Sequence, residues 1–395
     1  MTGGQRGCPA AVPLTQGPRH HFFGYYEICP WNATGQYHLC LETDFHDRPP
    51  TAQDEAVVGL VEKGSTTFQP LARTQAFNLQ QGAMLHWLPT NPAREICYNA
   101  RQGDRHVAVR MDIHSGHTQV LPRPVSGLSH SGILAASLNY ARLAEMRPVV
   151  GYRGLPDVFR GQEQPVDDGL FILNMLTGEA ELILSYAQIR DLFPQYPAMA
   201  THGLWFNHTE FSPDDRRVLA VVRWNEPGVE IKHTMLFSVG VDGRDVRMLA
   251  DLGASHFTWR SNREVFGWLT FEAGEWYYRL DTDTGDVSAP FCPDLLTRNG
   301  HCSCSADGRW LLTDEHWPEH QQKGLVLFDM RDQRRVELGR YAAPDRFRGE
   351  IRCDLHPRFN RDQTAVGFDS VHEGTRQVYE VDVAQWTADK AEVGK

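Results

Sequence analysis

Histidine recurs at a matching place in five repeated segments of the chain, and its imidazole could bind a metal ion or transfer a proton. The segments are HWLPTNPAREIC from His86, HTEFSPDDRRVL from His208, HFTWRSNREVFG from His256, HCSCSADGRWLL from His301 and HPRFNRDQTAVG from His356. Imidazole is the commonest side-chain ligand of metal ions, and its ordinary pKa suits proton transfer near neutral pH. Three or four imidazoles around one point would hold a divalent transition ion.

Further polar side chains lie close to these histidines in the repeats. Arg223 ends the second strand of its repeat, and Arg352, Cys353 and Asp354 come shortly before His356. Other polar and aromatic residues near the starts of the repeats are His20, His21, Tyr25, Tyr26, Asn78, Gln80 and Gln81. The block HHFFGYY is dense in aromatic residues. It either packs in the core under the closure of the fold or contributes to a site.

The spacing of the repeats is typical of a β-propeller. The last four copies begin 48, 45 and 55 residues apart, which suits one four-stranded blade each. Strand-like segments with Asp-Gly or Thr-Gly pairs at several of their turns follow the copies, and such pairs are strong hairpin signals. Two weaker copies without the histidine occur at 25–42 and 132–146. Seven first halves alternate with seven second halves, which predicts an all-β fold with seven blades.

We expect the ring to be closed by a strand from the N-terminal region. The last copy lacks its final strand, whereas the strand-like stretch AVPLTQ before His20 has no partner of its own. Pairing the two would remove exposed sheet edges. Residues 1–395 should therefore form a single seven-bladed propeller domain, with short helices only at 140–147 and 186–194. Since the first strand of each blade lines the channel, the five histidines should converge near one end of it.

The composition restricts partners and compartment. The chain has 39 basic and 50 acidic residues and a formal charge of −11, so we expect no nucleic-acid partner, which would require a clustered basic surface. A small anionic substrate stays compatible with this charge. The chain shows no signal-peptide core, no membrane-length apolar stretch and no CxxC pair among its eight cysteines. We expect a cytoplasmic protein without membrane association, and its oligomeric state stays open.

The pattern HxxFSPDxRRVL resembles the repeats of TolB-type propellers, and the histidine spacing with the segment RCDLHPR resembles the oligogalacturonate lyase family. The resemblance covers residues 200–370. It implies a seven-bladed propeller with a catalytic histidine and a Mn²⁺ ion held by further histidines on neighbouring blades. His256 falls at the position of the family's base, 45 residues before a metal-ligand position at His301, and His356 falls in the later ligand cluster. That cluster departs from the family, which has two histidines and a glutamine there.

The resemblance implies a carbon–oxygen lyase that cleaves uronic-acid-containing oligosaccharides by β-elimination. We assign His256 as the base, Arg223 as the partner of the substrate carboxylate, and His208, His301 and His356 as metal ligands. We expect Mn²⁺, with Zn²⁺ as the alternative because Cys302 and Cys353 could replace a ligand. A second class stays open, a non-catalytic propeller that binds a partner or ligand and uses its histidine ring only to tie strands together, as WD repeats do.

Overall fold

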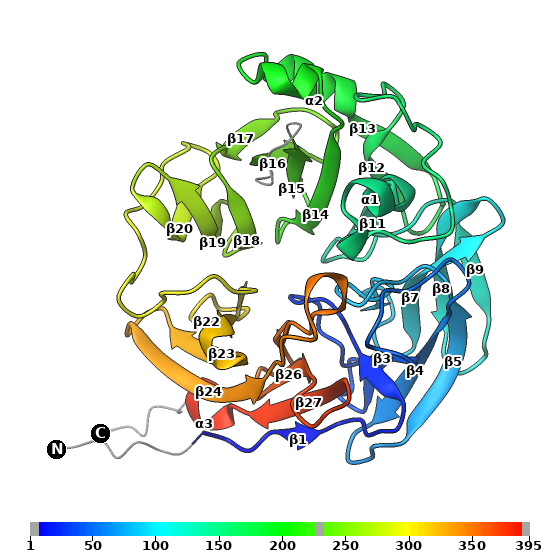
Figure 1. The fold of residues 1–395 in the computed structure, drawn as a ribbon, viewed down its shortest axis with the longest axis vertical. Helices are drawn as coiled ribbons and strands as arrows, with labels where there is room; N and C mark the ends of the chain where they lie inside the picture. The colour runs from blue at the N-terminus through cyan, green and yellow to red at the C-terminus, as the bar shows by residue number, and fades with distance from the viewer. Residues whose placement is uncertain (1–7, 226–232, 389–395) are drawn as a thin grey trace.

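Seven small antiparallel sheets stand around a central axis in the computed structural model, which describes residues 8–225 and 233–388 (Figure 1). Within these residues six sheets have four strands and the fifth along the chain has three. Neighbouring strands within each sheet follow one another in the chain, apart from β1 in the last sheet. The prediction of an all-β, seven-bladed propeller is confirmed.

The strands of the blades have the following bounds. Blades one to four contain β2 (His20–Phe22), β3 (Tyr37–Thr43), β4 (Ala56–Glu62), β5 (Phe68–Thr74); β6 (His86–Trp87), β7 (Glu95–Gln102), β8 (Arg105–Asp112), β9 (Thr118–Leu121); β10 (Gly127–Leu128), β11 (Leu134–Ser137), β12 (Gly169–Asn174), β13 (Ala180–Ser185); and β14 (Trp205–Phe211), β15 (Arg217–Trp224), β16 (His233–Gly240), β17 (Arg247–Ala250). Blades five to seven contain β18 (Ala254–Trp259), β19 (Glu264–Phe271), β20 (Gly274–Asp281); β21 (Ser303–Cys304), β22 (Trp310–Trp317), β23 (Gln322–Asp329), β24 (Arg334–Ala342); and β25 (Arg358–Phe359), β26 (Ala365–Ser370), β27 (Gln377–Asp382), β1 (Val12–Pro13).

The seventh sheet joins the two ends of the described chain. β1 runs antiparallel to β27, with Val12 opposite Glu380 and Pro13 opposite Tyr379. The backbone N–H of Leu14 extends this pairing by donating to the carbonyl of Val378 at 2.8 Å. The ring is therefore held together by hydrogen bonds between its ends, and β27 is not left as a free edge.

Short helices lie outside the sheets. They are α1 (Tyr140–Met146), α2 (Tyr186–Leu192), α3 (Ala384–Thr387) and the 3₁₀ turns η1 (Pro148–Val150), η2 (Pro197–Ala200), η3 (Pro318–His320) and η4 (Gly349–Ile351). The helices expected at 140–147 and 186–194 are confirmed as α1 and α2, but the expectation that helices occur only there is wrong, because α3 and the 3₁₀ turns are also present. α2 begins at a capping box in which Ser185 accepts from the backbone of Gln188 while the Gln188 side chain accepts from the backbone of Ser185. Among the described residues no helix is both long and apolar enough to cross a membrane.

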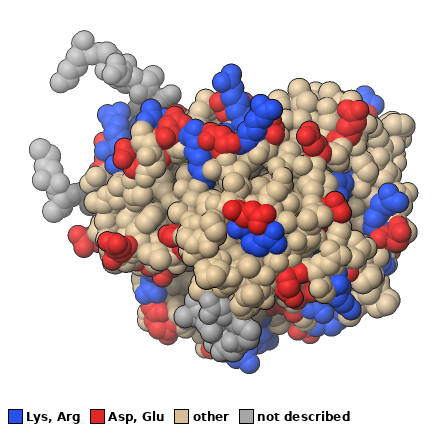
Figure 2. Space-filling view, turned by 90° about the horizontal axis from the view of Figure 1, so that it is seen from above, with Lys and Arg blue, Asp and Glu red and all other residues tan. Residues whose placement is uncertain are grey.

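The core lies between neighbouring blades, and β15 shows how the sequence produces it. Val218, Ala220 and Val222 pack toward the third blade, whereas Leu219 and Val221 pack toward the fifth. Successive side chains of a strand point to opposite faces, so a strand covered on both faces needs a continuous apolar run such as VLAVV. The rim is polar, and Figure 2 shows basic and acidic side chains interspersed over the side of the ring.

The innermost strand of the first blade is interrupted, and the segment within this interruption enters the channel. β2 ends at Phe22, and the chain returns to the sheet only at Trp31, which forms an isolated bridge with His38. The intervening segment places the rings of Tyr25 and Tyr26 in the protein interior, 6% and 1% exposed. Phe22, Phe23, Tyr25 and Tyr26 all belong to buried hydrophobic clusters, so core packing is confirmed for these four residues of the HHFFGYY block.

Two features hold this segment in place. Gly24 has a φ of 102°, and a Cβ added to it would overlap the backbone nitrogen of Gly82, so the two loops require glycine at their contact. The carboxylate of Asp369 accepts from the backbone N–H groups of Phe23 at 3.2 Å and Gly24 at 2.9 Å. Asp369 also pairs at 2.8 Å with the fully buried Arg358, which anchors the first blade to the last.

Candidate metal centre and active site

Four of the five repeated histidines occupy one structural position. The residue three positions after each of these histidines pairs with a residue at the start of the next strand. After His208, for example, this residue is Phe211, which pairs with Val218. The four histidines are His208, His256, His301 and His356, from blades four, five, six and seven. The backbone at this position turns into the left-handed region in two of them, with φ of 47° at His208 and 44° at His356. Such a conformation is strained for a non-glycine residue and concentrates at functional sites.

His86 does not belong to this group, so the expectation that five histidines share one channel mouth is wrong for it. Trp87 pairs with Ile96 as Phe211 pairs with Val218, so the residue equivalent to His208 is Met84, whose φ is 49°. The turn after Trp87 is two residues longer than the turn after Phe211, and a gapless alignment therefore shifts this repeat by two positions. His86 lines a cavity that none of the other four histidines lines.

The remaining four imidazoles gather around the ring of Tyr26. Its centroid lies 5.1 Å from His301, 6.0 Å from His256, 6.1 Å from His356 and 6.5 Å from His208. The His301 ring lies 3.9 Å from that of His256 and 4.2 Å from that of His356. Consecutive blades thus bring these side chains into one polar cluster above the tyrosine.

Three buried side chains in this cluster present donor atoms suited to a metal ion. Atoms of His301, Asp354 and His356 all lie within 4.8 Å of one another. The Nε2 atoms of the two histidines are 3.1 Å apart. Two imidazole nitrogens bound to one ion at about 2.1 Å would be roughly 3.0–3.4 Å apart, so this pair fits a shared ion. His208 lies outside the group of three, and its Nδ1 is 2.5 Å from the hydroxyl of Tyr25.

Asp314 determines which nitrogen of His301 is free. Both of its carboxylate oxygens lie 3.0 Å from Nδ1 of His301, and they also accept from the backbone N–H groups of His301 at 2.8 Å and His356 at 3.3 Å. Burial opposes the charge on Asp314, but the neighbouring His301 outweighs it and lowers its pKa. An ionised carboxylate only accepts, so Nδ1 carries the proton and Nε2 offers its lone pair.

Asp354 is ionised and held by two cations. Its Oδ1 accepts from the Lys323 ammonium at 2.5 Å and its Oδ2 from Nε of Arg352 at 2.6 Å. Burial favours the neutral acid, but Arg352 and Lys323 hold the pKa of Asp354 well below its ordinary value. The donor set is therefore two imidazoles and one carboxylate, which suits a divalent ion such as Mn²⁺ or Zn²⁺.

His256 has a free imidazole nitrogen beside this donor set. Its Nδ1 lies 2.8 Å from Oδ1 of Asn299, whose amide nitrogen donates to Ser255 at 3.0 Å. With Nδ1–H donating to Asn299, Nε2 is unprotonated and can accept a proton. Burial, followed by the charge of His301, lowers the pKa of His256 to about 3, so its imidazole is neutral at physiological pH.

Two arginines near the cluster have no carboxylate partner in the described chain. Arg223 is 5% exposed; its Nε donates to Thr234 at 3.1 Å, and its Nη1 is buried with no described hydrogen-bond partner. Nε of the half-buried Arg147 likewise has no partner among the described residues. Burial, with the charges of Arg223 and Arg352, lowers the pKa of Arg147 well below its ordinary value. Unpaired buried cations are costly unless an anion joins them, which makes this region suited to a carboxylate.

Two loops next to candidate site residues contact each other. η1, which directly follows Arg147, contacts η4, which directly precedes Arg352. Nη2 of Arg153 donates to both carboxylate oxygens of Glu350, at 2.7 and 2.8 Å, and links the two loops.

Comparison with solved structures relates this arrangement to known propellers. The chain superposes on oligogalacturonate lyase from Vibrio parahaemolyticus with a TM-score of 0.64, at 14% identity, over 94% of this chain and 93% of that one. An oligogalacturonate lyase in complex with manganese gives 0.64 at 15% identity, over 95% and 93%. This chain has the oligogalacturonate lyase fold. The propeller domain of the Trilobed protease from Pyrococcus furiosus gives 0.52 at 9% identity, over 92% and 96%. No protein-family model and no curated sequence matches the chain.

Within the oligogalacturonate lyase fold, only some of the predicted site residues lie in the donor group. His301 and His356 lie in the donor group, His256 contacts His301, and Arg223 lies near His208. Sequence reasoning named Asp354 as a neighbour but not as a ligand, and it missed Asp314, Lys323 and Arg147. The RCDLHPR segment carries a signal for Asp354, two residues before His356. Asp314 and Lys323 lie on β22 and β23, where the sequence pattern did not distinguish them.

Proposed function

We propose that this protein is a lyase that cleaves uronic-acid-containing oligosaccharides by β-elimination. The observation that carries the proposal is the contact of the neutral imidazole of His256 with His301 of the donor group, in a histidine cluster that also has the buried Arg223 near His208. The likeness in fold to oligogalacturonate lyases supports the same reaction class. The anionic substrate fits the guanidinium groups of Arg147 and Arg223, which have no carboxylate partner in the described chain.

The proposed reaction begins at the proton alpha to the uronate carboxylate. This proton is weakly acidic, because the carboxylate is already negative and removal of the proton adds a second negative charge to it. In our assignment, Nε2 of His256 takes the proton, and Arg223 binds the carboxylate and stabilises that charge. The carbon–carbon double bond then forms as the glycosidic carbon–oxygen bond breaks, and the leaving oxygen gains a proton. The products are a saturated sugar end and an unsaturated uronate.

The donor set His301, Asp354 and His356 would hold the divalent ion, with Mn²⁺ as the expected metal and Zn²⁺ as the alternative. A bound divalent ion supplies a Lewis acid for the charge that develops on the carboxylate. The neighbouring residues of the chain hold the donor atoms in the form that binds a metal ion. Asp314 holds the tautomer of His301, and Lys323 and Arg352 hold Asp354 ionised. Strand pairing alone does not require these five polar groups to lie together in one buried cluster.

The direct test is an assay of the purified full chain on saturated and unsaturated oligomers of several uronic acids. Formation of the conjugated double bond is followed by ultraviolet absorbance, and product masses identify the cleaved bond. We expect turnover on at least one oligouronate and none on a neutral oligosaccharide of the same linkage. Absence of turnover on every uronate, with metal present, would contradict the lyase assignment and favour a non-catalytic binding propeller.

A further inference from the structure

A cavity of about 510 Å³ is lined by residues that follow the clustered histidines in the chain, such as Glu210, Thr258 and Cys304. It falls within the usual size of small-molecule sites, about 300–1,000 Å³. None of the four clustered histidines lines it. Tyr25 does, and its hydroxyl lies 2.5 Å from Nδ1 of His208. The cavity therefore adjoins the histidine cluster but is lined by a different set of side chains.

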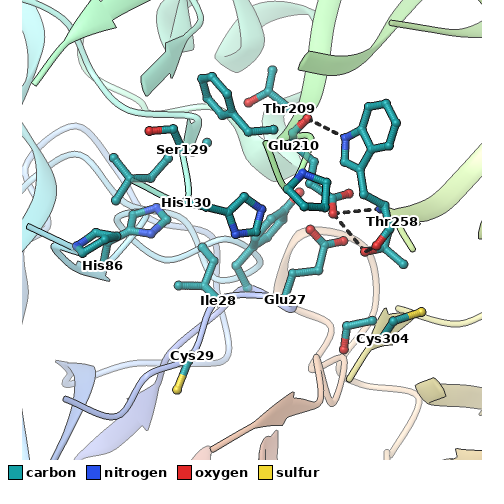
Figure 3. Close-up of a pocket in the computed structure, with 18 of the residues that line it drawn as sticks. Glu27, Ile28, Cys29, His86, Ser129, His130, Thr209, Glu210, Thr258 and Cys304 are labelled. Carbon is teal, nitrogen blue, oxygen red and sulfur yellow. Dashed lines mark hydrogen bonds between the residues drawn. The ribbon is translucent and has the colours of Figure 1, made fainter. Parts of the chain in front are cut away.

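Two carboxyl groups, Glu27 and Glu210, reach into this cavity from the same side (Figure 3). Oε1 of Glu210 accepts from the Thr258 hydroxyl at 2.9 Å and the Trp259 backbone N–H at 3.0 Å, whereas its Oε2 is buried with no described hydrogen-bond partner. Glu27 adopts a strained φ of 69°. Burial raises the pKa of Glu210 to about 8, and burial together with Glu210 raises that of Glu27 well above its ordinary value.

The described chain supplies no cation to this pair of carboxylates. In residues 8–225 and 233–388 neither glutamate forms an ion pair with Lys or Arg. Two arginines do line the cavity, but they are engaged elsewhere. Nη1 of Arg260 pairs with Glu264 at 2.6 Å, and Nε of Arg361 donates to the carbonyl of Trp31 at 2.9 Å. Buried carboxylates are normally matched by a cation or a proton, and neither Lys nor Arg of the described chain supplies the cation here.

His86 provides a second, independent sign of a ligand. It lies across the cavity from the glutamates in Figure 3, is 6% exposed, and its Nε2 is buried with no partner in the described chain. Burial lowers its pKa to about 4, so its imidazole is neutral and does not serve as the missing cation. Between His86 and the glutamates in Figure 3 lie the side chains of Ile28 and His130, and Met84 is a further apolar lining residue.

We infer that this cavity binds a small organic amine whose ammonium group sits at Glu27 and Glu210 and whose apolar body lies against Ile28, Met84 and Trp87. An ammonium group donates three hydrogen bonds and would satisfy the free Oε2 of Glu210 together with the carboxylate of Glu27. His86 supplies a polar contact at the far end of the ligand. The inference does not depend on the proposed lyase activity, because it uses none of the residues of the metal centre.

The test compares 2-phenylethylamine with 2-phenylethanol and 3-phenylpropanoate by isothermal titration calorimetry on the full, metal-loaded chain. The three probes share an apolar body and differ in charge. We expect the amine to saturate one site per chain and the alcohol and the acid to bind at least about tenfold more weakly. Equal affinity for amine and alcohol, or no saturable binding of the amine, would overturn the inference.

Variants locate the site. Glu27→Gln and Glu210→Gln should each weaken amine binding at least about tenfold, and His86→Ala should weaken it severalfold. The same change at the exposed Glu181 is the matched control and should leave the affinity unchanged. Unchanged amine affinity in both glutamine variants would place the ligand elsewhere and overturn the assignment. If a variant fails to fold, the comparison of the three probes on the unsubstituted chain still decides the question.

Discussion

His301 donates through Nδ1 to the carboxylate of Asp314, with both oxygens 3.0 Å away, and so keeps its Nε2 lone pair free at 3.1 Å from Nε2 of His356. The carboxylate belongs to β22, one strand outward from the channel, and acts on the metal centre through the histidine. We therefore expect Asp314→Asn to lower metal affinity about 10- to 100-fold while the fold persists. Metal content after dialysis against graded chelator measures this, with the 93%-exposed Asp104→Asn as the control. Equal chelator resistance of both variants would argue against the role of Asp314.

Metal removal is the second prediction. If His301, Asp354 and His356 bind a divalent ion, the purified chain should carry close to one ion per molecule, removable by a chelator. Turnover on a uronate oligomer should be lost with the metal and restored by Mn²⁺. Elemental analysis alongside the activity assay gives the answer. A metal-free chain with full activity would refute the assignment.

His256→Ala tests the proposed base. Removing a general base costs about 10²–10⁴-fold in rate, so we expect at least that loss of turnover, with bound metal and fold retained. Metal content reports the bound metal, and circular dichroism reports the fold. His114→Ala, at an exposed turn, is the control. Near-normal turnover of His256→Ala would transfer the role of base to another imidazole, with His208 the next to examine.

Arg147→Gln tests the anion-binding function of the loop before η1. A hydrogen bond to a charged group contributes about 1.5–3 kcal/mol, so we expect substrate affinity to fall roughly 10- to 100-fold. Arg147→Lys, which keeps the charge, should lose less. The comparison uses KM and kcat on the same oligouronate, and Arg105→Gln, at a side chain 65% exposed, is the control. If kcat/KM stays within twofold of the unsubstituted chain, Arg147 does not bind the substrate.

The protonation of His38 should make the free energy of unfolding depend on pH. It is fully buried in the first blade, and burial, then the charge of Arg358, lowers its pKa well below the ordinary 6.5. The folded state binds the proton more weakly than the unfolded state, so the contribution of His38 is complete above pH 6.5 and is lost as the pH falls. The loss approaches about 1.4 kcal/mol per pH unit.

Urea unfolding at pH 7.5, 6.0 and 5.0 measures this effect as a difference between the unsubstituted chain and His38→Leu. The leucine variant should lose less stability than the unsubstituted chain as the pH is lowered. His117→Leu, at an exposed turn, should follow the unsubstituted chain. A difference between His38→Leu and the unsubstituted chain that is constant over the three pH values would contradict the prediction.

The sequence by itself determined the number of blades and the class of the fold. Each blade is a local unit with its own apolar runs and turn residues, so the repeat could be counted without knowing any long-range contact. The same repetition brought His208, His256, His301 and His356 to one depth of the channel, because equivalent residues of consecutive blades lie at equivalent heights. His86 was misplaced because its hairpin is two residues longer, a difference that only the strand register shows.

Only the tertiary structure decided which of those histidines lie in the donor group and which contact other residues. Tyr25 reaches His208 from an interrupted strand of the first blade, Asp354 takes a place in the donor group, and Arg147 arrives on an insertion outside the repeats. None of these positions follows from the repeat, since each depends on where a non-repeated segment or a neighbouring strand passes across the channel. Local pattern specifies the blades, whereas contacts between residues distant in the chain, such as the 183 positions between Tyr25 and His208, create the site.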